Sequence, residues 1–143
     1  MNLTTGSKEK ERLEITVFGY EREHVGEYYD DNWLNCYLEL AFGGFNGKFE
    51  LSLLTRYFID LLPQVENLYS ALKGVTKFES MEQQLEFTLT GNGNGVIELK
   101  GDAMDMAGPT NQLYFYSEID QTYLPEIILQ LKQLIRKYPE RAQ

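Results

Sequence analysis

A chain of 143 residues with one histidine, His24, and one cysteine, Cys36, has few of the side chains on which many catalytic and metal sites depend. A Ser-His-Asp triad has only His24 available, and a structural zinc site, which takes four ligands, has only two candidates among cysteine and histidine. The net charge of −9 opposes binding to nucleic acid and to anionic membranes, and it favours basic partners.

The composition is that of a folded protein that does not enter a membrane. Aromatic residues make up 13% of the chain, a share that disordered chains lack. No apolar run approaches the ~18 residues of a membrane span, and the polar start of the chain has no apolar signal core. Cys36 has no second cysteine with which to form a disulfide. We therefore expect a cytoplasmic protein.

Apolar periodicity divides the chain into strands and helices. Residues 1–12 are polar and are expected to form a disordered or frayed lead-in, followed by a single α+β domain over residues 13–143. A charged loop is expected at residues 21–32. Alternation of apolar and polar residues predicts strands at 13–18, 33–42, 45–51, 75–78, 85–90, 96–104 and 113–119.

Two segments have apolar residues at helical spacing, near residues 54–72 and 122–138. Pro63 lies inside the first, where it predicts a kink or a division into two short helices. Because the strands alternate, one sheet face is expected to be buried and the other solvated. We therefore predict an α+β fold with a mainly antiparallel sheet and two amphipathic helices packed on one face. The packed stripes are expected at Leu61, Val65 and Leu68 and at Ile128, Leu131 and Ile135.

The densest polar cluster spans residues 27–33 (Glu-Tyr-Tyr-Asp-Asp-Asn-Trp), and its candidate partner-binding residues are Glu27, Tyr28, Tyr29, Asp30 and Asp31. Clustered carboxylates are candidates for binding Ca²⁺ or Mg²⁺, but adjacent acids point apart in an extended chain, and the spacing is not that of an EF-hand. Aspartate ahead of a strand also caps turns. Tyrosine beside acids suits a protein interface, because its ring gives a large contact area and a polar tip. We therefore predict no metal and no cofactor, and we treat the cluster as a partner-binding site with turn capping as the alternative.

A second candidate partner-binding site is on the strand predicted at 113–119. Tyr114 and Tyr116 lie on one face of it, because side chains alternate along a strand. Exposed tyrosines on a sheet can stack nucleotide bases. Binding phosphate, however, requires an excess of lysine and arginine, whereas this chain has an excess of acid. We therefore expect these tyrosines to pack against a protein partner or a helix.

The remaining motifs have simple structural interpretations. Residues 91–95 (Gly-Asn-Gly-Asn-Gly) are similar to a phosphate-binding loop, but a strand rather than a helix follows, which predicts a hairpin turn. Cys36 lies inside an apolar strand and is expected in the core, and His24 is expected to be a solvated loop residue. The 22 acidic residues leave open a catalytic carboxylate pair in a cleft.

Three stretches together resemble the WapI-type immunity proteins of bacterial toxin–immunity systems. They are residues 31–34 (Asp-Asn-Trp-Leu), the strands 85–89 and 96–99 with the Gly-Asn turn between them, and residues 117–124 ahead of the last helix. The order of elements is also similar, from about residue 13 to residue 137.

The resemblance implies a bacterial, cytoplasmic protein that is not an enzyme and that neutralises a cognate protein toxin by binding to it. The acidity of the chain adds the expectation that the toxin is basic. Two alternatives remain open. One is a small-ligand-binding or carboxylate-based enzyme domain with a cleft between sheet and helix, and the other is a homo-oligomer, such as a homodimer, whose exposed sheet face pairs with itself.

Overall fold

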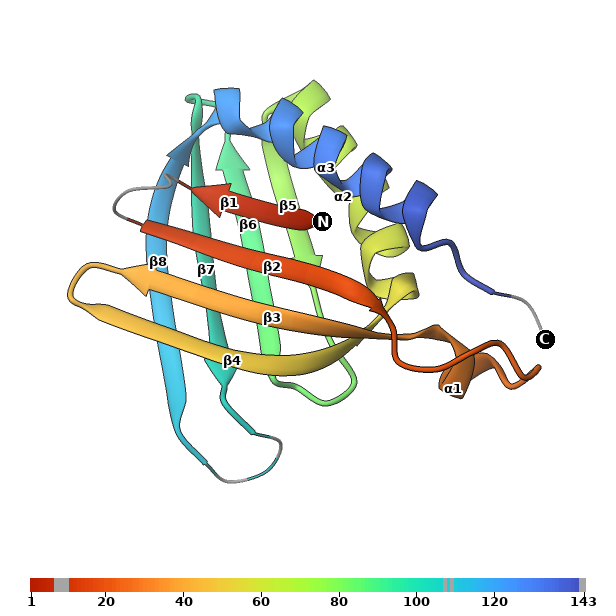
Figure 1. Cartoon of the computed structure of the whole chain (residues 1–143). Coiled ribbons are helices and arrows are strands. Elements are labelled where there is room, and N and C mark those ends of the chain that lie inside the picture. Colours follow the sequence, from red (N-terminus) through yellow and green to blue (C-terminus); the bar gives the residue numbers. More distant parts are fainter. Residues whose placement is uncertain (7–10, 107, 109, 142–143) are drawn as a thin grey trace.

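The computed structural model describes residues 1–6, 11–106, 108 and 110–141, which form two four-stranded antiparallel sheets and three α-helices (Figure 1). The first sheet has the order β1 (Asn2–Gly6), β2 (Glu11–Tyr20), β3 (Trp33–Phe42), β4 (Phe45–Leu54). The second has the order β5 (Lys73–Phe78), β6 (Leu85–Asn92), β7 (Val96–Met104), β8 (Gln112–Asp120). The helices are α1 (Tyr28–Asn32), α2 (Thr55–Ala71) and α3 (Leu124–Lys137), with a 3₁₀ turn, η1 (Gln121–Tyr123), before the last. The predicted α+β class and the antiparallel strands are confirmed.

Four strands followed by a long helix occur twice along the chain. The sequence pattern predicts one sheet and not this division into two. The strands of the first sheet cross those of the second at a steep angle, and α2 and α3 lie together along one side of the molecule (Figure 1). Helix α2 contacts α3 and β5, and α3 contacts β1. Buried side chains from both sheets and both long helices therefore form one hydrophobic core, which the helices close on one side.

The alternating strand pattern explains how each sheet faces this core. Along β3, every second residue is buried, including Leu34, Cys36 and Leu38, while the residues that alternate with them reach toward the outer face. In the second sheet, Phe87 on β6 is buried in the same way and stacks on Phe78 of β5, with ring centroids 5.0 Å apart. Each large apolar side chain buried in this way contributes about 1.5–3 kcal/mol, which fixes the register because a slip by one residue would expose the whole set.

Both predicted helices are present, and α2 is continuous. Leu61, Val65 and Leu68 are buried, as predicted, while Pro63 lies on the exposed side of a single helix. The alternative of two short helices is therefore wrong. Core packing before and after Pro63 outweighs the ~3 kcal/mol that a proline costs inside a helix. Neither this helix nor any other described one is both long and apolar enough to cross a membrane.

The predicted stripe of α3 is centred on its buried member, Leu131. Ile128 and Ile135 are partly buried and pack against the core. The fully packed side of the helix also includes Ile127 and Leu134. The stripe is therefore buried as expected, but it is rotated slightly from the positions that the sequence predicts.

The start of the chain differs from the prediction. Residues 2–6 of the expected frayed lead-in form β1, which pairs with β2, and Leu3 is fully buried. The Oε1 atom of Gln130 on α3 accepts a hydrogen bond from the backbone N–H of Thr4 at 2.8 Å. A strand as short and polar as β1 shows little alternation of apolar and polar residues in the sequence. Its contacts with β2 and α3 hold it in place. Residues 7–10 of the lead-in, and 107, 109, 142 and 143 of the predicted domain, lie outside the described residues.

Candidate protein-binding surfaces

The loop between β2 and β3 is organised around the carboxylate of Asp31, whose side chain is fully buried. Its oxygens accept hydrogen bonds from the backbone N–H groups of Val25 (2.9 Å), Gly26 (2.7 Å) and Glu27 (2.9 Å). Burial raises the pKa of Asp31, but these three bonds and nearby His24 outweigh it, so the pKa lies below its ordinary value. Asp31 therefore holds the loop together, as the turn-capping alternative predicts. Its carboxylate is buried within the chain, and its role in partner binding stays a prediction.

The neighbouring side chain, Asn32, joins this loop to a C-terminal clamp, which we define as residues 138–141. Asn32 is buried, and its Nδ2 donates hydrogen bonds to the carbonyl oxygens of Tyr28 (2.8 Å) and Arg141 (3.0 Å). Its Oδ1 accepts a bond from the backbone N–H of Arg141 at 2.7 Å. The Nε of Arg141 in turn donates to the carbonyl oxygen of Asp31 at 2.9 Å. Two segments about 110 positions apart in sequence are thus held together by reciprocal hydrogen bonds.

Tyr20, at the end of β2, packs against the same clamp. The guanidinium carbon of Arg141 lies 3.8 Å from the centre of the Tyr20 ring, within the range of a cation–π contact. The Tyr20 hydroxyl donates a hydrogen bond to the carbonyl oxygen of Pro139, and its ring meets that of Tyr138 edge-on at 5.8 Å. The clamp therefore also contacts the end of β2, where the loop begins.

Tyr28 makes hydrogen bonds within the protein. Its hydroxyl donates a hydrogen bond to the carboxylate of Glu140, which also accepts from the Nε of Arg56 on α2 at 3.0 Å. Burial and then the bond to Glu140 raise the pKa of Tyr28. Burial raises the pKa of Glu140, but the bonds from Tyr28 and Arg56 prevail and lower it. Tyr28 is thus half-buried in a three-residue contact that ties α1 to α2 and to the clamp.

Three members of the predicted cluster, Glu27, Tyr29 and Asp30, remain exposed. Tyr29 is 57% exposed, and its ring meets that of Tyr28 edge-on with centroids 5.1 Å apart. Asp30 lies 3.5 Å from Arg22 in an exposed ion pair. Residues 27–31 of the loop therefore present one exposed aromatic ring and two exposed carboxylates to solvent.

Tyr114 and Tyr116 lie on the outer face of the second sheet. Tyr114 is 73% exposed. The Tyr116 hydroxyl lies 3.0 Å from Oε1 of Glu98 and 3.2 Å from Oε1 of Glu118. The hydrogen bond to Glu98, with burial and the charge of Glu118, raises the pKa of Tyr116 to about 12. One ring is thus held in place by two carboxylates while the other is open to solvent.

The two tyrosines line a hollow of about 440 Å³ on this face. Charged side chains of both signs surround it, including Lys100 opposite Tyr116 and Asp102 opposite Tyr114 in the register of β7 and β8. Gly101 lies at its floor, where a Cβ atom would come within 2.2 Å of the Glu86 carbonyl oxygen and 2.7 Å of the Phe87 Cβ. Glycine at this position therefore allows β6 and β7 to approach closely, because a side chain there would clash with β6 on the core side of the sheet.

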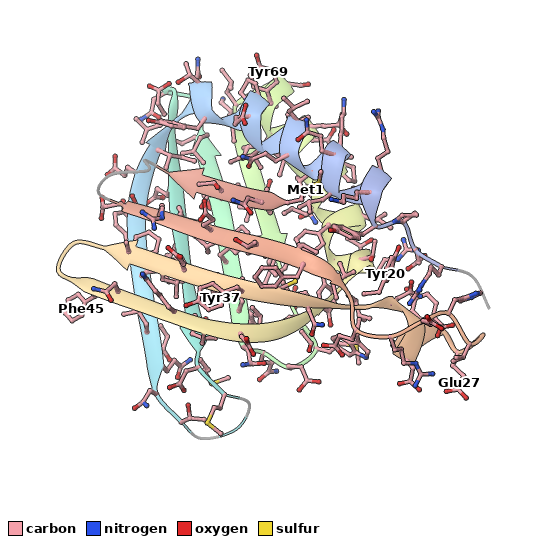
Figure 2. All side chains as sticks on the ribbon, viewed as in Figure 1. Met1, Tyr20, Glu27, Tyr37, Phe45 and Tyr69 are labelled. Carbon is pink, nitrogen blue, oxygen red and sulfur yellow. The ribbon has the colours of Figure 1, made fainter. Side chains whose placement is uncertain are left out.

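The loop and the tyrosine face do not meet. Helix α1 lies at one end of the molecule and β8 at the other (Figure 1), and Figure 2 shows Glu27 beyond the end of the first sheet, far from β8. The structure thus separates the predicted partner-binding residues into two surfaces. Sequence reasoning missed the support that the loop receives from Glu140 and Arg141, because nothing in the pattern of residues 138–141 indicates a distant partner.

A family comparison covers nearly all of the elements described above. The family model described as the Immunity protein WapI-like family matches residues 3–139. The chain belongs to this family. The resemblance stated from the sequence is thereby confirmed, and the matched range also includes β1.

The fold of this WapI-like immunity protein is similar to that of a solved structure titled "Crystal structures of trypanosoma bruciei MRP1/MRP2". The TM-score is 0.50 at 12% sequence identity, and the match covers 96% of this chain and 83% of the other. This likeness concerns the fold alone. No curated protein matches this chain in sequence.

Two side chains of this WapI-like protein that were considered for catalysis, Cys36 and His24, have neighbours within the fold that explain their positions. Cys36 is buried, and burial raises the pKa of its thiol to about 12, so it stays a neutral core side chain. His24 is about half exposed, and its Nε2 lies 3.5 Å from the buried carboxylate of Asp31. Among the described residues, no three His, Cys, Asp or Glu side chains are placed so that they could hold a metal ion.

Proposed function

We propose that this WapI-like immunity protein neutralises a cognate toxin by binding to it, without catalysis, in the cytoplasm of the bacterium that makes the toxin. The observation that carries the proposal is the family match over residues 3–139. Because the net charge of the chain is −9, we also propose that the toxin surface in contact with it is basic. Opposite charges raise the rate of association and disfavour other partners.

Binding without catalysis is supported by what the reactive side chains do in the fold. The carboxylate of Asp31 is engaged by three backbone N–H groups, which leaves it little capacity to act as a base. The thiol of Cys36 is buried, with its pKa raised far above neutral pH. Both groups stabilise the protein, and neither is presented to a substrate.

The outer face of the second sheet is the surface that we propose for toxin contact. Tyr114 supplies a large exposed ring next to a hollow, and tyrosine is enriched at the centres of protein interfaces. Asp102 and Glu86 at the same hollow supply negative charge for a basic side chain. The long stem of a lysine or arginine can lie against the tyrosine ring while its charged end meets these carboxylates. The exposed loop residues Glu27, Tyr29 and Asp30 are a second proposed contact.

Binding to a candidate toxin domain, taken from a toxin gene found next to the gene for this protein, tests the proposal. We expect Tyr114→Ala to weaken the affinity, measured by calorimetry, roughly tenfold or more, because a central tyrosine costs more than ~1.4 kcal/mol on truncation. Tyr69→Ala on α2 is the matched control, since Tyr69 is 46% exposed and remote from the hollow. Its affinity should stay within about twofold of wild type.

The loop is tested by Glu27→Lys combined with Tyr29→Ala, which leaves Tyr28 and the clamp intact. A weaker affinity with an unchanged melting temperature identifies the loop as a contact. The affinity of the wild type should also fall as salt rises, because exposed charges are screened beyond roughly 8 Å at physiological ionic strength. If the wild-type protein neither binds this toxin nor protects cells that express it, the proposed function is wrong. If it binds and both surfaces tolerate substitution, only the choice of surface is wrong.

A further inference from the structure

Strand β4 is the terminal strand of the first sheet, and its outer edge has no neighbouring strand in the described part of the chain. The other terminal strand of this sheet, β1, is contacted by α3, and β5 in the second sheet is contacted by α2. An uncovered edge presents a row of backbone groups that can pair with another strand. At ten residues, β4 is long enough for such pairing to be extensive.

The hairpin before β4 determines which residues direct their backbone groups outward. Phe42 and Phe45 are opposite each other across Gly43-Gly44, and Gly43 has a φ of 61° while Gly44 does not have a positive φ. This matches a type II′ turn, which closes on a hydrogen-bonded pair. Phe45 and every second residue after it therefore face β3. The residues that direct their backbone groups to the free edge are Asn46, Lys48, Glu50 and Ser52.

We propose that two copies of this chain form a homodimer by antiparallel pairing of their β4 strands about a twofold axis at Phe49. In this register Lys48 of each copy lies opposite Glu50 of the other. Phe49 is close to the middle of β4, so almost the whole strand takes part. The dimer joins the two first sheets into one continuous eight-stranded sheet, which follows from two four-stranded sheets meeting edge to edge.

The charges on β4 favour this pairing. Lys48 and Glu50 are exposed, lie on the same outer face and take part in no ion pair among the described residues. When β4 pairs antiparallel with β4 of a second copy, two opposite charges that are two positions apart lie directly across from each other. Directly opposed pairs of opposite charge stabilise a sheet. The edge of β8 contrasts with this, because Glu118 and Asp120 on its outer face have no basic residue beside them on the strand.

An apolar hollow beside the edge gives the partner's side chains a place to pack. It has a volume of about 260 Å³ and lies between β4 and the ends of β7 and β8. Phe49, Leu40, Ala103 and Leu113 are among its lining residues. Phe49 is partly buried against the core on this inner side. In the proposed register the second copy's Phe49 is directly opposite, so both rings contact one another at the hollow.

Light scattering coupled to size exclusion tests the proposal on the full chain over a wide range of protein concentrations. The wild type should form a species of twice the 16.6 kDa chain mass. Lys48→Glu and Glu50→Lys should each weaken dimerisation roughly tenfold or more, because each replaces two attractive pairs with two repulsive ones. An equimolar mixture of these two variants should form a heterodimer, and the double variant Lys48→Glu/Glu50→Lys should again form a homodimer.

Glu82→Lys is the matched control for Glu50→Lys, since it makes the same change in net charge at an exposed position outside β4 and should leave the dimer intact. Circular dichroism melting curves show whether each variant is folded. A wild type that stays monomeric at every concentration overturns the proposal. Folded single variants that dimerise as well as wild type, or a mixture that does not recover the dimer, also overturn it.

Discussion

Replacing Asn32 by alanine should separate the loop between β2 and β3 from the C-terminal clamp. The substitution removes three hydrogen bonds of 2.7–3.0 Å, two donated by Nδ2 and one accepted by Oδ1. A net contribution of about 1 kcal/mol for each bond gives a loss of about 3 kcal/mol in the free energy of unfolding. The bonds are part-buried, so water will replace them only incompletely and the loss should not fall much below this value.

Urea unfolding monitored by circular dichroism measures this free energy, and hydrogen exchange shows where the protection is lost. We expect faster exchange for the backbone N–H groups of Val25, Gly26 and Glu27, which bond to Asp31, because their support from the clamp is gone. Asn67→Ala is the control, since Asn67 is exposed on α2 and its substitution should change stability by no more than ~0.5 kcal/mol. A loss below about 1 kcal/mol for Asn32→Ala, with loop exchange unchanged, would refute the reasoning, because a single bond accounts for that much.

Three further outcomes are expected. Leu131→Ala in α3 should lower the free energy of unfolding by about 2–5 kcal/mol in urea, because Leu131 is fully buried, and a smaller loss would contradict its place in the core. Glu140→Gln should cost about 1 kcal/mol near neutral pH, where the carboxylate binds Arg56 and Tyr28. Because the folded-state pKa of Glu140 is lowered, this advantage exists above the ordinary pKa and is lost as pH falls through the lowered value, so wild type and variant should unfold alike in acid. His24→Ala should leave protection against the toxin intact in a growth assay, and loss of protection in folded protein would favour an enzyme.

The strands and long helices could be predicted because their signal is local. In β3, β6 and β7, buried residues alternate with partly or fully exposed ones, and this period of two is visible in the sequence. The same applies to the helical spacing of Leu61, Val65 and Leu68 in α2. Strand β1 could not be predicted in this way, because its few apolar residues gain their burial from β2 and α3.

The candidate surfaces show a similar limit. The sequence identified an acidic and aromatic cluster at residues 27–31, but it could not distinguish Asp31, which is buried, from Asp30, which is exposed. Adjacent aspartates have the same chemistry, and their roles differ only because the chain turns to place three N–H groups around one of them. Tyr114 and Tyr116 were correctly placed on one strand face, while the hollow that they line also depends on residues of the neighbouring strands.

The sequence by itself determined the antiparallel α+β class, the boundaries of every element except β1 and α1 to within a few residues, the acidity and the family resemblance. The class, the boundaries and the acidity depend on residue periodicity and composition, and the family resemblance depends on short motifs, so none of them requires knowledge of contacts between distant segments. The tertiary structure alone decided the division into two sheets, the clamp of Arg141 on Asn32, and the free edge of β4. Each of these results from packing and backbone hydrogen bonds between segments far apart in the chain, and such contacts leave no local pattern from which they could be predicted.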